Sequence, residues 1–342
     1  MGTTQLEAPE TRSPITWREM VSPYEAPRPH RSILQLVTTL IPLGFAFYVM
    51  YLSLQLPYWV TLLLALPTAG LTVRTFTIMH DCAHGSFFRQ RWANDTVGWI
   101  TGVLTLTPYI NWRRDHVIHH ASSGDLNRRG HGDVWTMTVR EYQESSRSQK
   151  FLYRLYRHPL VMFGLGPLHL AFGQRRIPRG TSRRQKEVYS VRETNLALIA
   201  LILGFSAWIG PLALLEIYAP VFMIAGASGI WLFYVQHQFD GTYWADHSQW
   251  DYLTASIRGS SYFKLPAVLN WFTCSIGLHH VHHLSPRIPN YRLKECHQAN
   301  EPLQEARVIT LLESPKTVRL TLWDEDQQRL VGWKALAEGH AP

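Results

Sequence analysis

Residues 277–284 read Gly-Leu-His-His-Val-His-His-Leu, so four imidazoles fall within five positions. If the stretch is helical, His279, His282 and His283 stand at positions i, i+3 and i+4 and share one face, whereas His280 points away from it. One such tract alone is more often a weak, accidental metal binder than a catalytic site. Its meaning depends on the histidines elsewhere in the chain.

Two other stretches repeat this spacing. Residues 80–84 read His-Asp-Cys-Ala-His, and residues 116–120 read His-Val-Ile-His-His. A further histidine, His237, ends an apolar run. The candidate metal ligands are therefore nine of the 17 histidines: His80, His84, His116, His119, His120, His237, His279, His282 and His283.

Nine imidazoles are too many for one zinc ion, which normally takes three or four protein ligands. They suit two metal ions with four or five imidazoles each, because neutral imidazole binds iron, copper, nickel and zinc. Two redox-active metals side by side can activate O2 for attack on an unreactive C–H bond, which zinc cannot do. Nearby carboxylates would orient the rings by accepting their hydrogen bonds, with a helix cap or a solvated side chain as the ordinary alternative. The candidates for this role are Asp81, Asp115, Asp125 and Asp240.

Apolar residues are concentrated in a few runs, although the 342-residue chain has a mean hydropathy of only −0.11. Four runs are long enough to cross a hydrocarbon core of about 30 Å as helices. Two shorter runs, interrupted by prolines, are expected to lie in the membrane interface or against the bundle. The expected spans are residues 33–56, 57–79, 195–219 and 220–239, and the interfacial segments are residues 97–112 and 159–172.

The chain has a formal net charge of +8, and its arginines flank the apolar runs, which favours a membrane surface over nucleic acid as the partner. A basic run follows the second interfacial segment, and the positive-inside rule places it in the cytoplasm. Its members are Arg175, Arg176, Arg179, Arg183, Arg184 and Lys186. Since four spans return the chain to its starting side, both termini and all four groups of histidines are expected at the cytoplasmic boundary.

These patterns predict an all-α integral membrane protein with four transmembrane helices and a cytoplasmic helical cap that carries the histidine site. Residues 1–32 are expected to form an N-terminal cytoplasmic arm, residues 33–300 the catalytic domain and residues 301–342 a cytoplasmic tail. Alternation over residues 318–323 predicts a strand in the tail. Cys82, Cys274 and Cys296 show no disulfide-framework spacing and are expected to be free thiols.

The order His-x-x-x-His, His-x-x-His-His, His-x-x-His-His, with apolar runs between, resembles the membrane fatty acid desaturase family. The resemblance covers about residues 33–291 and looks closest to bacterial acyl-lipid Δ12 (omega-6) desaturases. The stretches that carry it are residues 80–88, 235–239 and 277–291. Residues 33–300 would then form the desaturase domain.

The resemblance implies a di-iron centre. Its ligands would be the histidines of the three motifs, called histidine boxes (residues 80–84, 116–120 and 279–283), and one histidine from the last span, here His237. It implies that a cis double bond is inserted into an acyl chain with O2 and two electrons from ferredoxin or cytochrome b5. The chain contains no His-Pro-Gly-Gly stretch of a fused haem domain, so a separate donor is expected, with ferredoxin favoured by the basic surface. The implied location is the bacterial inner membrane.

Several alternatives remain open from the sequence. The same kind of centre can hydroxylate, epoxidise or ketolate an acyl chain or lipid, and the boxes do not distinguish these outcomes. A metal transporter would need ionisable residues at the middle of its spans, and these runs are nearly free of charge. A haem electron carrier would use paired histidines within its spans. The position of the double bond and the acyl carrier are not readable from these residues.

Overall fold

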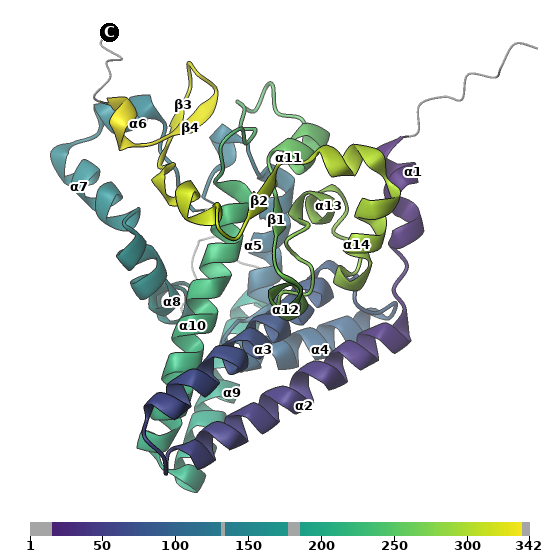
Figure 1. The fold of residues 1–342 in the computed structure, drawn as a ribbon, viewed down its shortest axis with the longest axis vertical. Helices are drawn as coiled ribbons and strands as arrows, with labels where there is room; N and C mark the ends of the chain where they lie inside the picture. Colours follow the sequence, from purple (N-terminus) through teal and green to yellow (C-terminus); the bar gives the residue numbers. More distant parts are fainter. Residues whose placement is uncertain (1–15, 131–133, 177–184, 337–342) are drawn as a thin grey trace, which may run out of the picture.

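The computed structural model describes residues 16–130, 134–176 and 185–336. Within these ranges, four helices are long and apolar enough to cross a membrane. They are α2 (Pro29–Ser53), α3 (Trp59–His84), α9 (Gln185–Ile209) and α10 (Pro211–His237). The α2–α3 and α9–α10 turns lie at one end of this bundle, and the remaining elements gather toward the other end as a cap (Figure 1).

Shorter elements form the cap and its connections. The helices are α1 (Trp17–Val21), α4 (Arg91–Leu104), α5 (Tyr109–Ser122), α6 (Val139–Glu144), α7 (Arg147–Tyr156), α8 (Gly166–Leu168), α11 (Tyr252–Arg258), α12 (Ala267–Phe272), α13 (His279–Leu284) and α14 (Asn290–Ala299). The strands are β1 (Tyr262–Lys264) parallel to β2 (Val308–Thr310), and β3 (Leu322–Asp324) antiparallel to β4 (Arg329–Val331). The fold is therefore mostly helical rather than all-α.

The helix α3 is the centre of the bundle and leads directly to the first histidine pair. It packs against α2, α4 and α10. Gly85 ends α3 immediately after His84, in the left-handed conformation (φ +70°) that glycine adopts without strain. The first histidine box is thereby held on the last turns of a rigid helix.

The expected border between the third and fourth spans is wrong. The chain turns at Gly210, where φ is +88°, and Pro211 begins α10. Pro220, which the sequence suggested as the border, lies inside α10. The turn falls at Gly210–Pro211 because a glycine supplies the left-handed backbone and a proline fits the first helical position.

Both short apolar segments are helical and shorter than a span, as expected, but the first is divided. Residues 97–112 are not one helix, because α4 ends at Leu104 and α5 begins after Pro108, which caps it. Residues 160–173 form a continuous helical segment in which α8 lies between two π-helical stretches.

The two ends of the described chain pack on the cap. Val21 of α1 is 1% exposed and belongs to a core with residues of α13 and α14, so the described part of the N-terminal arm is docked there. The expected strand at residues 318–323 overlaps β3 only at its last two positions, because residues 314–319 form a 3-10 helix. Trp323 of β3 is buried against Trp244.

The buried guanidinium of Arg157 ties the end of α7 to α10 and to the tail. It donates to the Tyr234 hydroxyl (2.9 Å), to Gln238 Oε1 (3.2 Å) and to the Leu320 carbonyl (2.8 Å). We expect Arg157→Met to lower the free energy of unfolding by roughly 2–3 kcal/mol, because it leaves buried acceptors without donors. Arg154→Met on the exposed face of α7 is the control and should cost less than about 1 kcal/mol. Equal melting temperatures of the two variants in detergent would contradict this role of Arg157.

Candidate metal centre

The structure brings all nine candidate histidines into two buried groups at the cap end of the bundle. They come from the end of α3, from α5, from the last residue of α10 and from α13. The first group contains His80, His84, His116, His120 and His282, and the second contains His119, His237, His279 and His283. Within each group, one ring nitrogen of every histidine lies within 4.8 Å of those of the others.

Three Nε2 atoms in each group lie close together. In the first group, His120 Nε2 lies 3.1 Å from His116 Nε2 and 3.0 Å from His282 Nε2. In the second group, His237 Nε2 lies 3.2 Å from His119 Nε2 and 2.9 Å from His279 Nε2. Two nitrogens bound to one metal at 2.0–2.1 Å are separated by roughly 2.9–3.4 Å, so these spacings fit ions held between the rings.

The two groups adjoin, because two helices contribute to both. Helix α5 gives His116 and His120 to the first group and His119 to the second. Helix α13 likewise divides its histidines between them. The rings of His120 and His283, one from each group, stack with centroids 4.1 Å apart.

Two of the Nε2 atoms support the assignment of these groups as metal sites, because neither has a hydrogen-bond partner among the described residues. His84 Nε2 and His283 Nε2 are buried, and no hydrogen bond to either is found in the described residues. A buried polar atom without a partner is costly, and a bound cation would satisfy it. The donor set of neutral nitrogens is also one that iron, copper, nickel and zinc accept.

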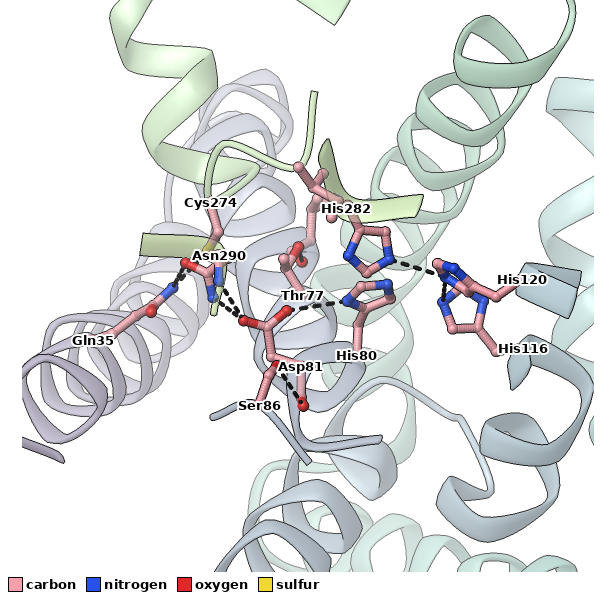
Figure 2. A network of polar contacts seen from close by, with 12 residues as sticks. Gln35, Thr77, His80, Asp81, Ser86, His116, His120, Cys274, His282 and Asn290 are labelled. Atoms are coloured by element: carbon pink, nitrogen blue, oxygen red, sulfur yellow. Dashed lines mark hydrogen bonds and ion pairs between the residues drawn. The ribbon is translucent and has the colours of Figure 1, made fainter. Parts of the chain in front are cut away.

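A polar network behind the first group orients His80 (Figure 2). His80 Nδ1 lies 3.2 Å from Asp81 Oδ1, and a proton on Nδ1 would leave Nε2 free for a metal. Asp81 is 1% exposed, and its Oδ2 accepts from the backbone amide (2.7 Å) and side-chain amide (2.8 Å) of Asn290. Gln35 of α2 donates from Nε2 to Asn290 Oδ1 (3.0 Å) and to Cys274 Sγ (2.9 Å). The network therefore links the first span, the first histidine pair and α14.

The other carboxylates proposed to orient the rings are placed differently. Asp125 is buried, but its Oδ2 accepts from His247 Nδ1 at 2.7 Å, and His247 is not one of the nine histidines. Asp115 is exposed on α5, and Asp240 is exposed in the turn after α10. Asp81 Oδ1 faces a candidate ligand, as proposed.

The sequence reasoning missed Gln35 and Asn290. Gln35 is a polar side chain inside an otherwise apolar run, which is a signal of function or pairing in a membrane helix. Asn290 lies in the stretch after the third histidine box, but nothing in its spacing indicates its partner. Both residues are buried.

Arginines expected at the surface are partly inside. Arg74 of α3 is 7% exposed, because its guanidinium donates to Thr39 Oγ1 (2.9 Å) and lies over the Trp271 ring (4.1 Å). Arg175 donates to Thr107 Oγ1 (2.6 Å), and Arg176 donates to Asn195 Oδ1 (2.9 Å). The other arginines of that basic run, Arg179, Arg183 and Arg184, lie outside the described residues.

Burial lowers the pKa of five histidines on α5 and α13. Desolvation first, and then neighbouring imidazoles, lower the pKa of these side chains well below the ordinary value of 6.5. The affected residues on α5 and α13 are His116, His120, His279, His282 and His283. A neutral ring keeps its lone pair, so metal binding at neutral pH needs no proton release from them.

We expect the metal-free protein to lose stability as the pH falls below 6.5. The unfolded chain takes up protons on these histidines near their ordinary pKa of 6.5, whereas the folded chain does not, so acid favours unfolding. Each such histidine contributes a slope of up to about 1.4 kcal/mol per pH unit. The check is the melting temperature in detergent at about pH 7.5 and about pH 5.5. His282→Leu removes one of these histidines and should reduce the difference between the melting temperatures at the two pH values. Equal melting temperatures of the wild-type protein at both pH values would contradict the expectation.

Four apolar helices and two adjoining groups of buried histidines define a helical membrane protein with side chains able to hold metal. The sequence model of the fatty acid desaturase family matches residues 53–314, and the chain belongs to this family, as its histidine boxes indicated. It is an oxidoreductase of the desaturase type.

Three relatives illustrate the similarity. A fatty acid desaturase of Bacillus subtilis (strain 168) is 43% identical over 318 residues, which cover 93% of this chain and 90% of the relative. An sn-1 acyl-lipid omega-3 desaturase (ferredoxin) of Synechocystis sp. is 27% identical, with 67% of this chain and 64% of the relative covered. An omega-3 fatty acid desaturase of the endoplasmic reticulum of Nicotiana tabacum is 29% identical, with 67% and 61% covered. The match therefore spans less than two thirds of the length of the last two relatives.

Proposed function

We propose that the chain inserts a cis double bond, at the Δ12 (omega-6) position, into an acyl chain of a membrane lipid with O2 and two electrons. Its cofactor is a pair of iron ions bound by His80, His84, His116, His120 and His282 on one side and by His119, His237, His279 and His283 on the other. The observation that carries this proposal is the division of nine imidazoles into two adjoining groups of five and four. Such a donor set suits two redox-active ions better than one zinc ion.

Iron would supply the activation of O2 that removal of two hydrogens from neighbouring methylenes requires. The protein's own contribution is to hold the rings and to exclude water. Eight of the nine histidines are buried and His84 is half-buried, so bulk water has little access to the ring nitrogens. The rings stand on four helices, so the packing of the protein itself positions them for a metal.

We infer the orientation of the protein in the membrane from the positive-inside rule, because arginines flank the apolar helices. We place the histidine groups and both termini on the cytoplasmic side of the bacterial inner membrane, since α1 and the β3–β4 hairpin lie at the cap end (Figure 1). Labelling of an introduced cysteine in the α2–α3 turn, from outside intact cells, tests this assignment. Labelling of a cysteine in the β3–β4 turn under the same conditions would contradict it.

A separate ferredoxin is the proposed electron donor. The support comes from the cyanobacterial relative, whose name specifies ferredoxin. Turnover of the purified protein with reduced ferredoxin is the expected result. Turnover with cytochrome b5 and none with ferredoxin would reject this part of the proposal.

The function is tested by expression in a host that makes oleate but no linoleate, followed by fatty acid profiling. New linoleate, absent in a His282→Ala strain, is the expected result. Because acyl-lipid relatives are omega-3 desaturases, a parallel culture is supplied with linoleate. New α-linolenate in the culture supplied with linoleate, with no linoleate made from oleate in the first culture, would show omega-3 selectivity. It would reject the Δ12 position. A hydroxy, epoxy or keto product would reject desaturation.

A further inference from the structure

Two adjoining hollows lie between α4 and α9, outside the histidine groups. The first is about 320 Å³ and the second about 420 Å³, both within the range of about 300–1,000 Å³ typical of ligand sites. Along α4, Arg91 and Asp95 line the first hollow, and Trp99 and Val103 line the second, at steps of four residues. One face of α4 thus runs from the first hollow into the second.

The same progression occurs on α9. Lys186, Tyr189 and Glu193 line the first hollow, and Ala197 and Leu201 line the second. Since both helices begin at the first hollow and continue to the second, they run side by side in the same direction. The two hollows therefore follow one another along the same pair of helices, and together they are here called the α4–α9 groove.

The first hollow is charged and has donors suited to a phosphate. Its cations are Arg91, Arg113 and Lys186, and its acids are Asp95 and Glu193. Arg113 Nη1 lies 2.7 Å from Asp95 Oδ1, and Arg91 Nε lies 3.7 Å from Asp95 Oδ2. Asp95 thereby faces both guanidinium groups, and each guanidinium has further N–H donors beyond the one that faces this carboxylate.

The second hollow is apolar and borders the part of α9 that can lie in a membrane. Besides the residues above, Ile100, Leu104 and Ala200 line it. Two alanines on α9 leave space there, and exposed Trp99, Ile100, Leu104 and Leu201 present hydrocarbon or aromatic surface. A charged hollow at the end of a span, followed by exposed apolar surface, matches the shape of a membrane lipid. The polar group of such a lipid lies at the interface, and its acyl chains lie in the hydrocarbon.

We propose that the α4–α9 groove binds one glycerophospholipid, with its phosphate in the charged hollow and an acyl chain in the apolar hollow. Neither half of the groove alone selects this ligand. A soluble anion would use only the charged hollow, and a hydrocarbon or a sterol would use only the apolar one. A glycerophospholipid joins the two chemistries in one molecule in the same order. The charged hollow is linked to the metal centre by α5, on which Arg113 precedes His116 by about one helical turn.

Binding is tested with the purified full-length protein in detergent, titrated with phosphatidylglycerol and followed by native mass spectrometry. Wild-type protein is expected to retain one lipid. The double variant Arg91→Glu/Lys186→Glu removes cations from the charged hollow, and Ala200→Trp fills the apolar hollow. Each should weaken binding by about tenfold or more. All three positions are exposed, so equal melting temperatures should show that the variants fold.

Matched controls are Arg192→Glu and Ala207→Trp, at exposed positions of α9 outside the groove. Both should bind the lipid as wild type does. Equal weakening in controls and groove variants, or none in either, would identify ordinary annular lipid and overturn the proposal. Competition by inorganic phosphate, with Ala200→Trp without effect, would reduce the site to an anion site and overturn it as well. The measurement needs neither iron nor turnover, so its outcome is independent of the proposed desaturation.

Discussion

Replacing His282 by alanine is expected to release the metal of the five-histidine group and to lower desaturation at least about a hundredfold. His282 Nε2 lies 3.0 Å from His120 Nε2, and its ring is 4.5 Å from that of His80, so it faces partners on both α5 and α3. Its loss removes the one ligand that α13 gives to this group. The measurements are iron per chain in the purified variant and the fatty acid profile of the expressing strain.

His280→Gln is the matched control, because His280 lies in the same tract and is equally buried. Its Nε2 lies 3.3 Å from His297 Nδ1, and it belongs to neither metal group. The variant should keep its iron and its activity. Equal losses in His280→Gln and His282→Ala would mean that the tract acts through packing rather than through ligation.

Asp81→Asn is expected to weaken iron binding by about tenfold to a hundredfold, although Asp81 belongs to neither metal group. Asp81 Oδ2 accepts two hydrogen bonds from Asn290, and Oδ1 faces His80 Nδ1 (Figure 2). An amide in its place must turn its NH2 toward one of these donors, so His80 or Asn290 loses its acceptor. Titration of the apo-protein with ferrous iron against a competing chelator measures the effect.

Asp240→Asn is the control for loss of a carboxylate, because Asp240 is exposed after α10. It should bind iron as wild type does. In a double-mutant cycle, Asp81→Asn and Asn290→Ala should be strongly non-additive, because the two side chains share hydrogen bonds. Additive effects, or an unchanged iron affinity in Asp81→Asn, would contradict the positioning of His80 by Asp81.

The existence of four long apolar helices and the gathering of nine histidines could both be predicted from local sequence. An apolar run must be long enough to cross the hydrocarbon core, so its length predicts a membrane span. Histidines three and four residues apart lie on one face of a helix, so their spacing predicts that they face a common point. The border between the third and fourth spans could not be fixed this way, because Pro220 is tolerated inside α10 while Gly210 makes the turn. Proline alone therefore misplaced the border by about ten residues.

The sequence predicted four or five imidazoles for each metal ion, but it did not show which histidine belongs to which group. Helices α5 and α13 each divide their histidines between the groups, and this division depends on how each helix is rotated in the cap. The hydrogen-bond partners of the buried carboxylates also could not be predicted from the sequence. Asp81 meets Asn290 from 209 residues away, and Asp125 meets His247 from 122 residues away. Such contacts are set by tertiary packing rather than by periodicity.

The central claim is that two adjoining groups of imidazoles hold two iron ions. It is tested most directly by the metal content of the purified, detergent-solubilised protein, measured by elemental analysis against the concentration of polypeptide. The account predicts two iron ions per chain, falling to about one in His282→Ala. One ion per chain in the fully loaded wild-type protein, or zinc in place of iron, would contradict it.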